Sequence, residues 1–230
     1  MLLALDTATA TASLALYDLA AGHLLLEMTW DARRRQTQDL LVAAQRACAL
    51  VECTPQQVTA LAVTTGPGSF TGVRIGISTA KGIGLGLAAP PAVVGLPTLT
   101  VTAAPWLAAA AALIPRPRLC AYLQAGRGRY NWAWFHAVDP LPRPAAGDHH
   151  AGTAVEFAAA LADMAGPLWL VGEAAADLHS AVAPLAHVTM IDAVSSLRRA
   201  GHLARLAAQA IAAGQVDSLA ALQPLYLRNP

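Results

Sequence analysis

The chain has 230 residues, of which 56% are hydrophobic and 13% charged, and its formal net charge is +1 at pH 7. This length suits one large domain or two small lobes, and the balanced charge gives no general electrostatic case for nucleic-acid binding. Cys48, Cys53 and Cys120 lack the C-x-x-C spacing of a zinc site and are too few for a disulfide framework. We therefore expect a reducing, cytoplasmic location.

The segment from residue 82 to residue 115 contains no charged side chain. Its prolines divide it into pieces shorter than the ~20 continuous apolar residues that a membrane-spanning helix needs, so we expect buried core and no membrane association. The first residues form a strand-like apolar run without a basic n-region, which predicts that no export signal is present.

Three short apolar runs, at residues 1–6, 13–17 and 24–30, predict an antiparallel meander at the start of the chain. Residues 36–51 then show helical periodicity, with one broad apolar face made of Leu40, Leu41, Ala44, Ala47, Cys48 and Val51. A strand at 61–65, a glycine-rich helix and a strand at 92–94 complete a β-β-β-α-β-α-β order. That order favours a mixed sheet covered by helices, as in a ribonuclease-H-like lobe.

The glycine-rich helix follows the loop at residues 66–68, and Thr71 is its expected N-cap. Each glycine in a helix interior costs about 1 kcal/mol relative to alanine, so a structural reason for them is expected. Four small residues recur at every fourth position and form a stripe that is nearly free of side chains: Gly72, Gly76, Ala80 and Gly84. Another element can approach this stripe closely, and it can belong either to the same domain or to a second subunit.

The loop matches neither of two familiar phosphate-binding patterns, because the third glycine falls one place late for G-x-G-x-x-G and no Gly-Lys-Ser/Thr follows for a Walker A loop. Beyond it, Pro97 is a candidate first residue of a helix that Pro105 is expected to end or kink, which places a lobe boundary at about residues 100–105.

The second half predicts an α/β alternation on a smaller scale. Strands are expected at 119–123 and 131–137, with Trp132, Trp134 and His136 on one face of the second strand, followed by a polar loop from 140 to 152. A helix at 154–164, a strand at 168–171, a helix at 174–182 and a last helix at 195–213 follow.

Residues 66–76 (GPGSFTGVRIG) and 79–82 (TAKG) resemble the signature of the TsaB (YeaZ) family, bacterial proteins needed to make threonylcarbamoyladenosine in tRNA. Residues 3–8 and 224–228 fit the same family. The resemblance implies an α/β, two-lobed actin-like (ribonuclease-H-like) fold with a mixed sheet in which the second lobe is smaller and degenerate. It divides the chain into a first lobe at 1–103, a second lobe at 104–194, a helix at 195–214 that packs back on the first lobe, and a tail at 215–230.

The resemblance further implies a non-catalytic scaffold or activator subunit of a threonylcarbamoyl transferase complex. Its partners would be a TsaD-like catalytic subunit and a TsaE-like ATPase, with a homodimer when alone and tRNA reached only through the complex. ATP and metal are expected on the partner subunits, and no cofactor is expected in this chain. The implied interface comprises Gly72, Arg74, Gly76, Ile77, Ala80 and Gly84 from one helix and Leu40, Ala44 and Ala47 from the other.

Actin-like proteins hold ATP phosphates with an aspartate followed by a glycine-containing turn. Residues 6–12 (DTATATA) keep the aspartate and hydroxyls but no glycine, so Asp6, Thr7 and Thr9 are candidates for a vestigial nucleotide site. Capping of its own turn is the favoured role of Asp6.

Two other segments depart from the patterns of related proteins. Residues 33–39 lack the His-x-x-x-His metal pair of the TsaD-like relative, and Gln36 stands where family members often carry histidine. Residues 124–129 (QAGRGR) lack the acidic turn that family members often show. The adjacent His149 and His150 are expected to be solvated.

Two further functions stay open at this point. One is a small ATP-dependent phosphotransferase or ATPase with an unusual phosphate hairpin, and the other is a homodimeric binding module with a different client. No G-x-S-x-G elbow supports a serine hydrolase. The only basic run, at residues 33–35, is too short to predict an RNA patch, and whether it touches tRNA within a complex is left open.

Overall fold

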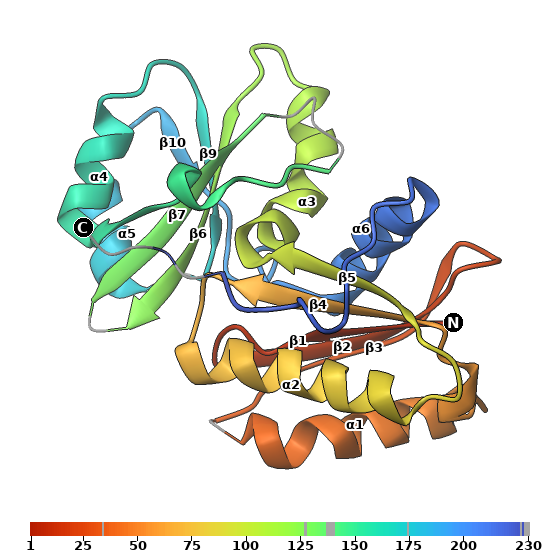
Figure 1. Ribbon diagram of the computed structural model, residues 1–230. Helices are drawn as coiled ribbons and strands as arrows, with labels where there is room; N and C mark the ends of the chain where they lie inside the picture. Colours follow the sequence, from red (N-terminus) through yellow and green to blue (C-terminus); the bar gives the residue numbers. More distant parts are fainter. Residues whose placement is uncertain (34, 127, 137–140, 174, 226, 228–230) are drawn as a thin grey trace. The chain divides into compact units, whose positions relative to one another are not determined.

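The computed structural model describes residues 1–33, 35–126, 128–136, 141–173, 175–225 and 227. The middle of the basic run at 33–35, the end of the strand expected at 131–137 and parts of the motif at 224–228 lie outside the described residues. The chain divides into two compact units, here called unit 1 (Met1–Thr98 with Arg199–Leu225) and unit 2 (Leu99–Arg198) (Figure 1).

Unit 1 contains a five-stranded mixed sheet in the order β3-β2-β1-β4-β5. The first three strands form the predicted antiparallel meander, whereas β4 and β5 run parallel to β1. This confirms the mixed-sheet α/β arrangement predicted from the sequence. The strands are β1 (Leu2–Asp6), β2 (Thr11–Asp18), β3 (His23–Asp31), β4 (Ala60–Gly66) and β5 (Ala92–Pro97).

Helices cover both faces of this sheet. Helices α1 (Gln36–Leu50) and α2 (Phe70–Gly86) lie together on one face, and α6 (Ala200–Ala212) lies on the other (Figure 1). Because side chains alternate along a strand, Leu3 and Leu5 of β1 enter the core beneath α1 and α2. A short 3-10 helix, η1 (Pro55–Gln57), connects α1 to β4.

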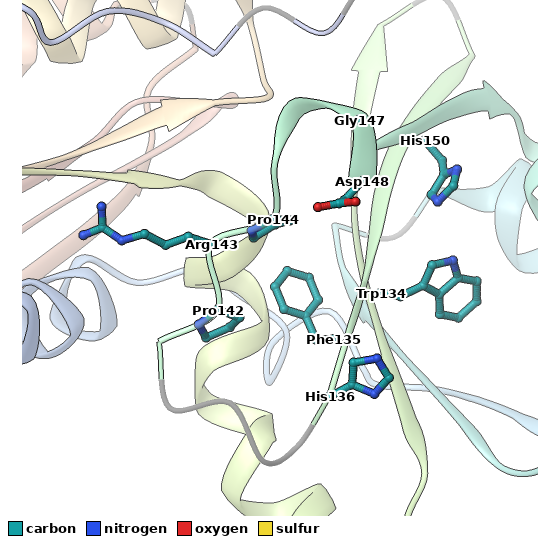
Figure 2. A pocket seen from close by; sticks show the side chains of 9 residues that line it. All are labelled: Trp134, Phe135, His136, Pro142, Arg143, Pro144, Gly147, Asp148 and His150. Atoms are coloured by element: carbon teal, nitrogen blue, oxygen red, sulfur yellow. The ribbon is translucent and has the colours of Figure 1, made fainter.

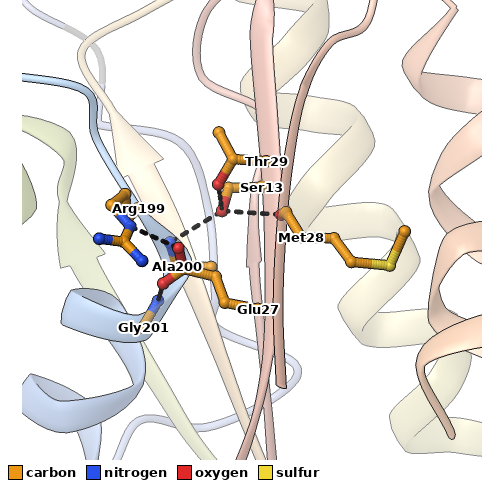
Figure 3. A network of polar contacts seen from close by, with 7 residues as sticks. All are labelled: Ser13, Glu27, Met28, Thr29, Arg199, Ala200 and Gly201. Atoms are coloured by element: carbon orange, nitrogen blue, oxygen red, sulfur yellow. Dashed lines mark hydrogen bonds and ion pairs between the residues drawn. The ribbon is translucent and has the colours of Figure 1, made fainter. Parts of the chain in front are cut away.

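The last helix, α6, begins at Ala200, five residues later than predicted. Residues 193–196 form a turn instead, in which Asp192 Oδ1 accepts hydrogen bonds of 3.0 Å from the backbone N–H groups of Val194 and Ser195. A side chain of strand β2 fixes the start of this helix (Figure 3), because Ser13 Oγ accepts a hydrogen bond of 2.9 Å from the Ala200 N–H. Sequence periodicity could not locate this start, because the capping groups come from the far end of the chain.

Unit 2 contains a second five-stranded mixed sheet in the order β10-β9-β6-β7-β8, which repeats the pairing pattern of unit 1. Its two edge strands, β8 and β10, have only four and three residues and were missed in the sequence, where β8 falls in the expected polar loop. The strands are β6 (Arg118–Gly126), β7 (Arg129–Phe135), β8 (His150–Thr153), β9 (Leu168–Gly172) and β10 (Val188–Met190).

Three helices complete unit 2. Helix α3 (Thr98–Ala111) packs on one face of the sheet, and α4 (Ala154–Ala162) and α5 (Ala176–Val182) pack on the other, where Tyr122, Tyr130 and Phe157 are fully buried. The short 3-10 helix η2 (Ala146–Asp148) precedes β8.

Pro105 was expected to end or kink helix α3, and the helix continues through it, so the first of these two alternatives is wrong. Proline removes one backbone donor, and the burial of Leu99, Val101 and Ala103 in the same helix offsets that loss. The boundary expected between residues 103 and 104 falls inside this helix, whereas the two units divide between Thr98 and Leu99. None of the helices in the described ranges is long and apolar enough to cross a membrane.

Candidate functional site

The glycine-rich loop before α2 is held against the turn between β1 and β2. The Ser69 N–H donates to the Ala8 carbonyl at 2.6 Å, and Thr7 Oγ1 donates to the Gly72 carbonyl at 2.7 Å. Ser69, with an extended ψ of 122°, caps the helix by accepting from the Gly72 N–H at 3.2 Å, so the prediction of Thr71 as the cap is wrong. The close approach requires Gly68, since a Cβ there would overlap the Ala8 carbonyl.

The stripe of small residues on α2 packs inside unit 1. A Cβ on Gly72 would overlap the Thr7 carbonyl, and one on Gly76 would lie 2.7 Å from Thr7 Oγ1 and 3.3 Å from Val63 Cγ2. Further along, a Cβ on Gly84 would lie 2.8 Å from Leu219 Cδ2. The stripe therefore allows β1, β4 and the C-terminal segment to approach the helix, which is the intramolecular alternative weighed from the sequence.

The structure places most of the residues assigned to the interface on the packed sides of these two helices. Of the nine residues assigned to it, Arg74 is exposed. The other eight are buried within unit 1: Gly72, Gly76, Ile77, Ala80, Gly84, Leu40, Ala44 and Ala47. The sequence pattern identified the packed side of each helix correctly but could not tell what covers it.

The opposite side of the same two helices is partly apolar and exposed. Leu41 on α1 is 50% exposed and Phe70 on α2 is 61% exposed, and a depression of ≈ 340 Å³ spans the beginnings of both helices. The Arg74 guanidinium carbon lies 3.7 Å from the Phe70 ring centroid, a cation–π contact between positions four apart. We call this surface the outer face, and it comprises Thr37, Leu41, Phe70, Thr71, Arg74, Ile75, Ser78 and Thr79.

Of the outer face, the sequence predicted only Arg74 as a surface residue, and it placed Leu41 with the residues of the packed side. The available signal was a helical repeat on the side of each helix that faces away from its packed side. On α2 this repeat contains Phe70 and Arg74, and on α1 it contains Thr37 and Leu41. Apolar residues on that side indicate exposed hydrophobic surface once the glycine side is known to be packed.

The candidate nucleotide residues are buried and engaged within unit 1. Asp6 Oδ1 accepts hydrogen bonds of 2.9 Å from the Ala8 N–H and from Thr64 Oγ1, which is the turn-capping role favoured from the sequence. The Thr9 carbonyl accepts from Gln36 Nε2 at 3.2 Å, so this glutamine fixes the turn to the start of α1. A phosphate at this turn would have to displace the bonds that join it to the α2 loop.

A second hollow lies within unit 2. Figure 2 shows Trp134 of β7 and His136, which follows this strand, together with His150 of β8 on one side, while Phe135 points to the other side of the strand. Its described lining also contains Arg143 and Asp148, and none of the lining residues that the structure describes is a serine, threonine, cysteine or lysine that could supply a hydroxyl, thiol or amine nucleophile. Within the described ranges, no three His, Cys, Asp or Glu side chains gather in a way that could hold a metal ion.

Of the adjacent histidines near this hollow, His149 is partly buried, contrary to the expectation that both are solvated, whereas His150 is exposed as expected. His149 Nδ1 lies 2.9 Å from the Ala145 carbonyl, and burial lowers the pKa of His149. The His150 ring stacks on Trp132 with centroids 5.6 Å apart. The segment expected to be a loop contains strand β8. Its pairing with β7 places His150 opposite Trp132 and so brings the two rings together.

Comparison with known proteins places this geometry in a family. Residues 30–229 match the family described as "TsaD: tRNA N6-adenosine threonylcarbamoyltransferase". The chain is 35% identical over 135 residues to the tRNA threonylcarbamoyladenosine biosynthesis protein TsaB of Escherichia coli, a match that covers 58% of this chain and 54% of the relative. For the TsaB of Haemophilus influenzae the identity is 38% over 102 residues, covering 44% and 41%. The match thus spans about half the length of these relatives or less.

The fold comparison covers the whole chain. The solved structure of YeaZ from Pseudomonas aeruginosa has a TM-score of 0.77 and 27% identity, and it covers 98% of this chain and 99% of that one. This agreement confirms the two-lobed actin-like fold predicted from the sequence. The chain therefore belongs to the TsaB (YeaZ) family, and it matches the family model that is described as TsaD, tRNA N6-adenosine threonylcarbamoyltransferase.

Proposed function

We propose that this chain is a non-catalytic subunit of the machinery that makes threonylcarbamoyladenosine in tRNA. Its task is to pair with a TsaD-like catalytic subunit and so support that subunit's transfer reaction. The names of the relatives support the pathway, because both are TsaB proteins of threonylcarbamoyladenosine biosynthesis. The transferase named in the family description supports the identity of the partner.

The observation that carries the proposal is the outer face of α1 and α2. Leu41 and Phe70 expose apolar side chains there although both helices have well-packed inner sides. Exposed apolar patches rimmed by polar residues mark protein interaction sites, and here Thr37, Arg74 and Ser78 form the polar surround. Aromatic and arginine side chains often contribute most of the binding energy of an interface. The Phe70–Arg74 contact holds two such side chains in position before a partner binds.

The hydrogen bonds made by the turn between β1 and β2 support the non-catalytic part of the proposal. A catalytic nucleotide site needs backbone and carboxylate groups that are free to meet phosphates and a cation. In this chain, the Asp6 carboxylate and the Thr7 hydroxyl already form buried hydrogen bonds to neighbouring segments. ATP and metal are accordingly assigned to the TsaD-like subunit and to a TsaE-like ATPase, and tRNA is reached through the assembled complex.

We further propose that the same outer face forms a homodimer when the chain is alone. One apolar surface can pair with its own copy by two-fold symmetry and exchange that copy for the catalytic subunit when it is present. Homodimer and heterodimer would then be alternatives that compete for one surface.

Surface substitutions test this pairing without disturbing the core. Leu41→Glu and Phe70→Glu should leave the thermal melt of the isolated chain nearly unchanged and weaken pairing with the TsaD-like subunit at least tenfold, as measured by light scattering and titration. Val216→Glu is the matched control, because Val216 is 51% exposed in unit 1 but lies outside the outer face. Normal pairing of both face variants would refute the assignment.

A further inference from the structure

Helix α1 ends in a tight backbone motif that brings two cysteines together. The Cys53 N–H donates to the Cys48 carbonyl at 2.9 Å, and the Glu52 N–H donates to the Ala49 carbonyl at 3.3 Å. Glu52 has a φ of 54°, in the left-handed region that commonly ends a helix. These three features define a Schellman motif, in which the third-last helical residue and the second residue beyond the cap make a side-chain contact.

In this chain, both of those positions are cysteines. Cys48 is buried and Cys53 is partly exposed, and both pack against the same core cluster. The Schellman geometry sets these two side chains beside each other, and both thiols are free. The arrangement therefore places one sheltered thiol directly beside one that solvent can reach.

We propose that Cys48 and Cys53 form a redox-active dithiol that a peroxide oxidises to an intramolecular disulfide. Cys53, the accessible thiol, attacks hydrogen peroxide as its thiolate, breaking the O–O bond and giving a sulfenic acid and hydroxide. The Cys48 sulfur then attacks the Cys53 sulfur and displaces its hydroxyl group, which leaves as water with the Cys48 proton. In sum, two thiols and one hydrogen peroxide give one disulfide and two waters.

The environment assigns different roles to the two sulfurs. Burial, together with the hydrogen bond to Cys53, raises the pKa of Cys48 to about 11, so Cys48 remains protonated at neutral pH. The thiolate is the form that reacts with peroxide, so the first step is assigned to Cys53, and Cys48 attacks only after Cys53 has been oxidised. Transient disulfides of this kind are the type found in reducing compartments, where the reduced pair is the resting state.

Mass spectrometry of the folded chain tests the proposal. Trypsin releases residues 47–74 as one peptide that contains both cysteines and no other, while Cys120 lies in a separate peptide. After mild peroxide treatment, peptide 47–74 should lose two hydrogen atoms and resist alkylation, and dithiothreitol should restore it. Cys120 is completely buried and should remain reduced, which makes it the internal control.

Single variants separate the two steps. In Cys48→Ala, Cys53 should accumulate a sulfenic acid that dimedone captures, whereas in Cys53→Ser the remaining Cys48 should stay reduced. Formation of only sulfinic or intermolecular products in the wild type, or equal oxidation of Cys120, would overturn the proposal.

An arsenical probe checks the juxtaposition without oxidation. Phenylarsine oxide, which needs two neighbouring thiols, should bind the folded chain with one-to-one stoichiometry. Cys120→Ser should retain this binding, and Cys48→Ala and Cys53→Ser should each lose it. Absence of binding to the folded wild type would show that the two sulfurs do not meet and would also overturn the proposal.

Discussion

The backbone N–H of Gly201 donates a hydrogen bond of 2.8 Å to Oε2 of Glu27, joining positions 174 residues apart. The same carboxylate accepts from Arg199 Nε at 2.5 Å, and a Cβ on Gly201 would overlap Glu27 Oε2 (Figure 3). A carboxylate at a helix N-terminus satisfies free N–H groups and interacts favourably with the helix dipole. Strand β3 thus fixes the start of α6, and with it the return of the chain to unit 1.

Replacing this carboxylate should destabilise unit 1. Glu27→Gln removes the charge from a nearly buried, charge-assisted contact, so we expect a loss of about 1–3 kcal/mol in the free energy of unfolding. Denaturant titration measures the loss. Asp31→Asn on the same strand is the control, because the Asp31–Arg33 pair is exposed and should contribute less than about 1 kcal/mol. Equal effects of the two substitutions would contradict the capping role.

Glycines on opposite sides of α2 should respond oppositely to substitution. Gly76→Leu must displace Thr7 and Val63, so we expect destabilisation of the isolated chain by about 1–3 kcal/mol or more. A Cβ on Gly82 meets nothing within 4 Å, and Gly82→Ala should stabilise the helix by up to about 1 kcal/mol. Thermal melts of both variants check this. A Gly76→Leu variant that keeps its stability but loses pairing would restore the stripe as a partner surface.

The stability of unit 1 should fall at mildly acidic pH because of His202. Burial, with a further contribution from Arg205, lowers the pKa of His202 below its usual value of 6.5. The unfolded chain then takes up the proton first, so the contribution is complete above about pH 6.5 and is lost as the pH falls below that value. Between pH 7.5 and pH 5.5 the wild-type melting temperature should therefore fall more than that of His202→Gln. Parallel curves for the two proteins would exclude this histidine as the cause.

Titration with Mg-ATP distinguishes the subunit from the phosphotransferase or ATPase alternative. Because Asp6 and Thr7 are engaged within unit 1, isothermal calorimetry of the isolated chain should detect no micromolar site. Micromolar binding that disappears in Asp6→Ala would favour the enzyme, provided that circular dichroism shows the variant to be folded.

Local sequence patterns predicted most elements of this fold. Apolar runs and helical periodicity located β1 to β5 and α1 closely, because those segments have one uniformly packed side. The short strands β8 and β10 were missed, since three or four residues carry no measurable period and gain their structure from sheet pairing. The start of α6 depends on Ser13 and Glu27, which no local pattern around residue 200 can reveal.

The candidate site was less predictable than the fold. The spacing of Gly72, Gly76 and Gly84 showed that something approaches α2 closely, but not that Thr7, Val63 and Leu219 do so. The cysteine pair was overlooked for a related reason. Glu52 occupies the left-handed position that glycine usually marks, so the motif joining Cys48 to Cys53 has no glycine signal in the sequence.

Reconstitution of the tRNA modification most directly tests whether this chain is a required partner subunit. Threonylcarbamoyladenosine would be measured by nucleoside mass spectrometry with the TsaD-like and TsaE-like proteins of the same host, in reactions containing the wild-type chain, Phe70→Glu, Val216→Glu or no added chain. The account predicts product with the wild type and Val216→Glu, and at least a tenfold loss with Phe70→Glu or without the chain. Equal product in the reaction that lacks the chain would contradict it.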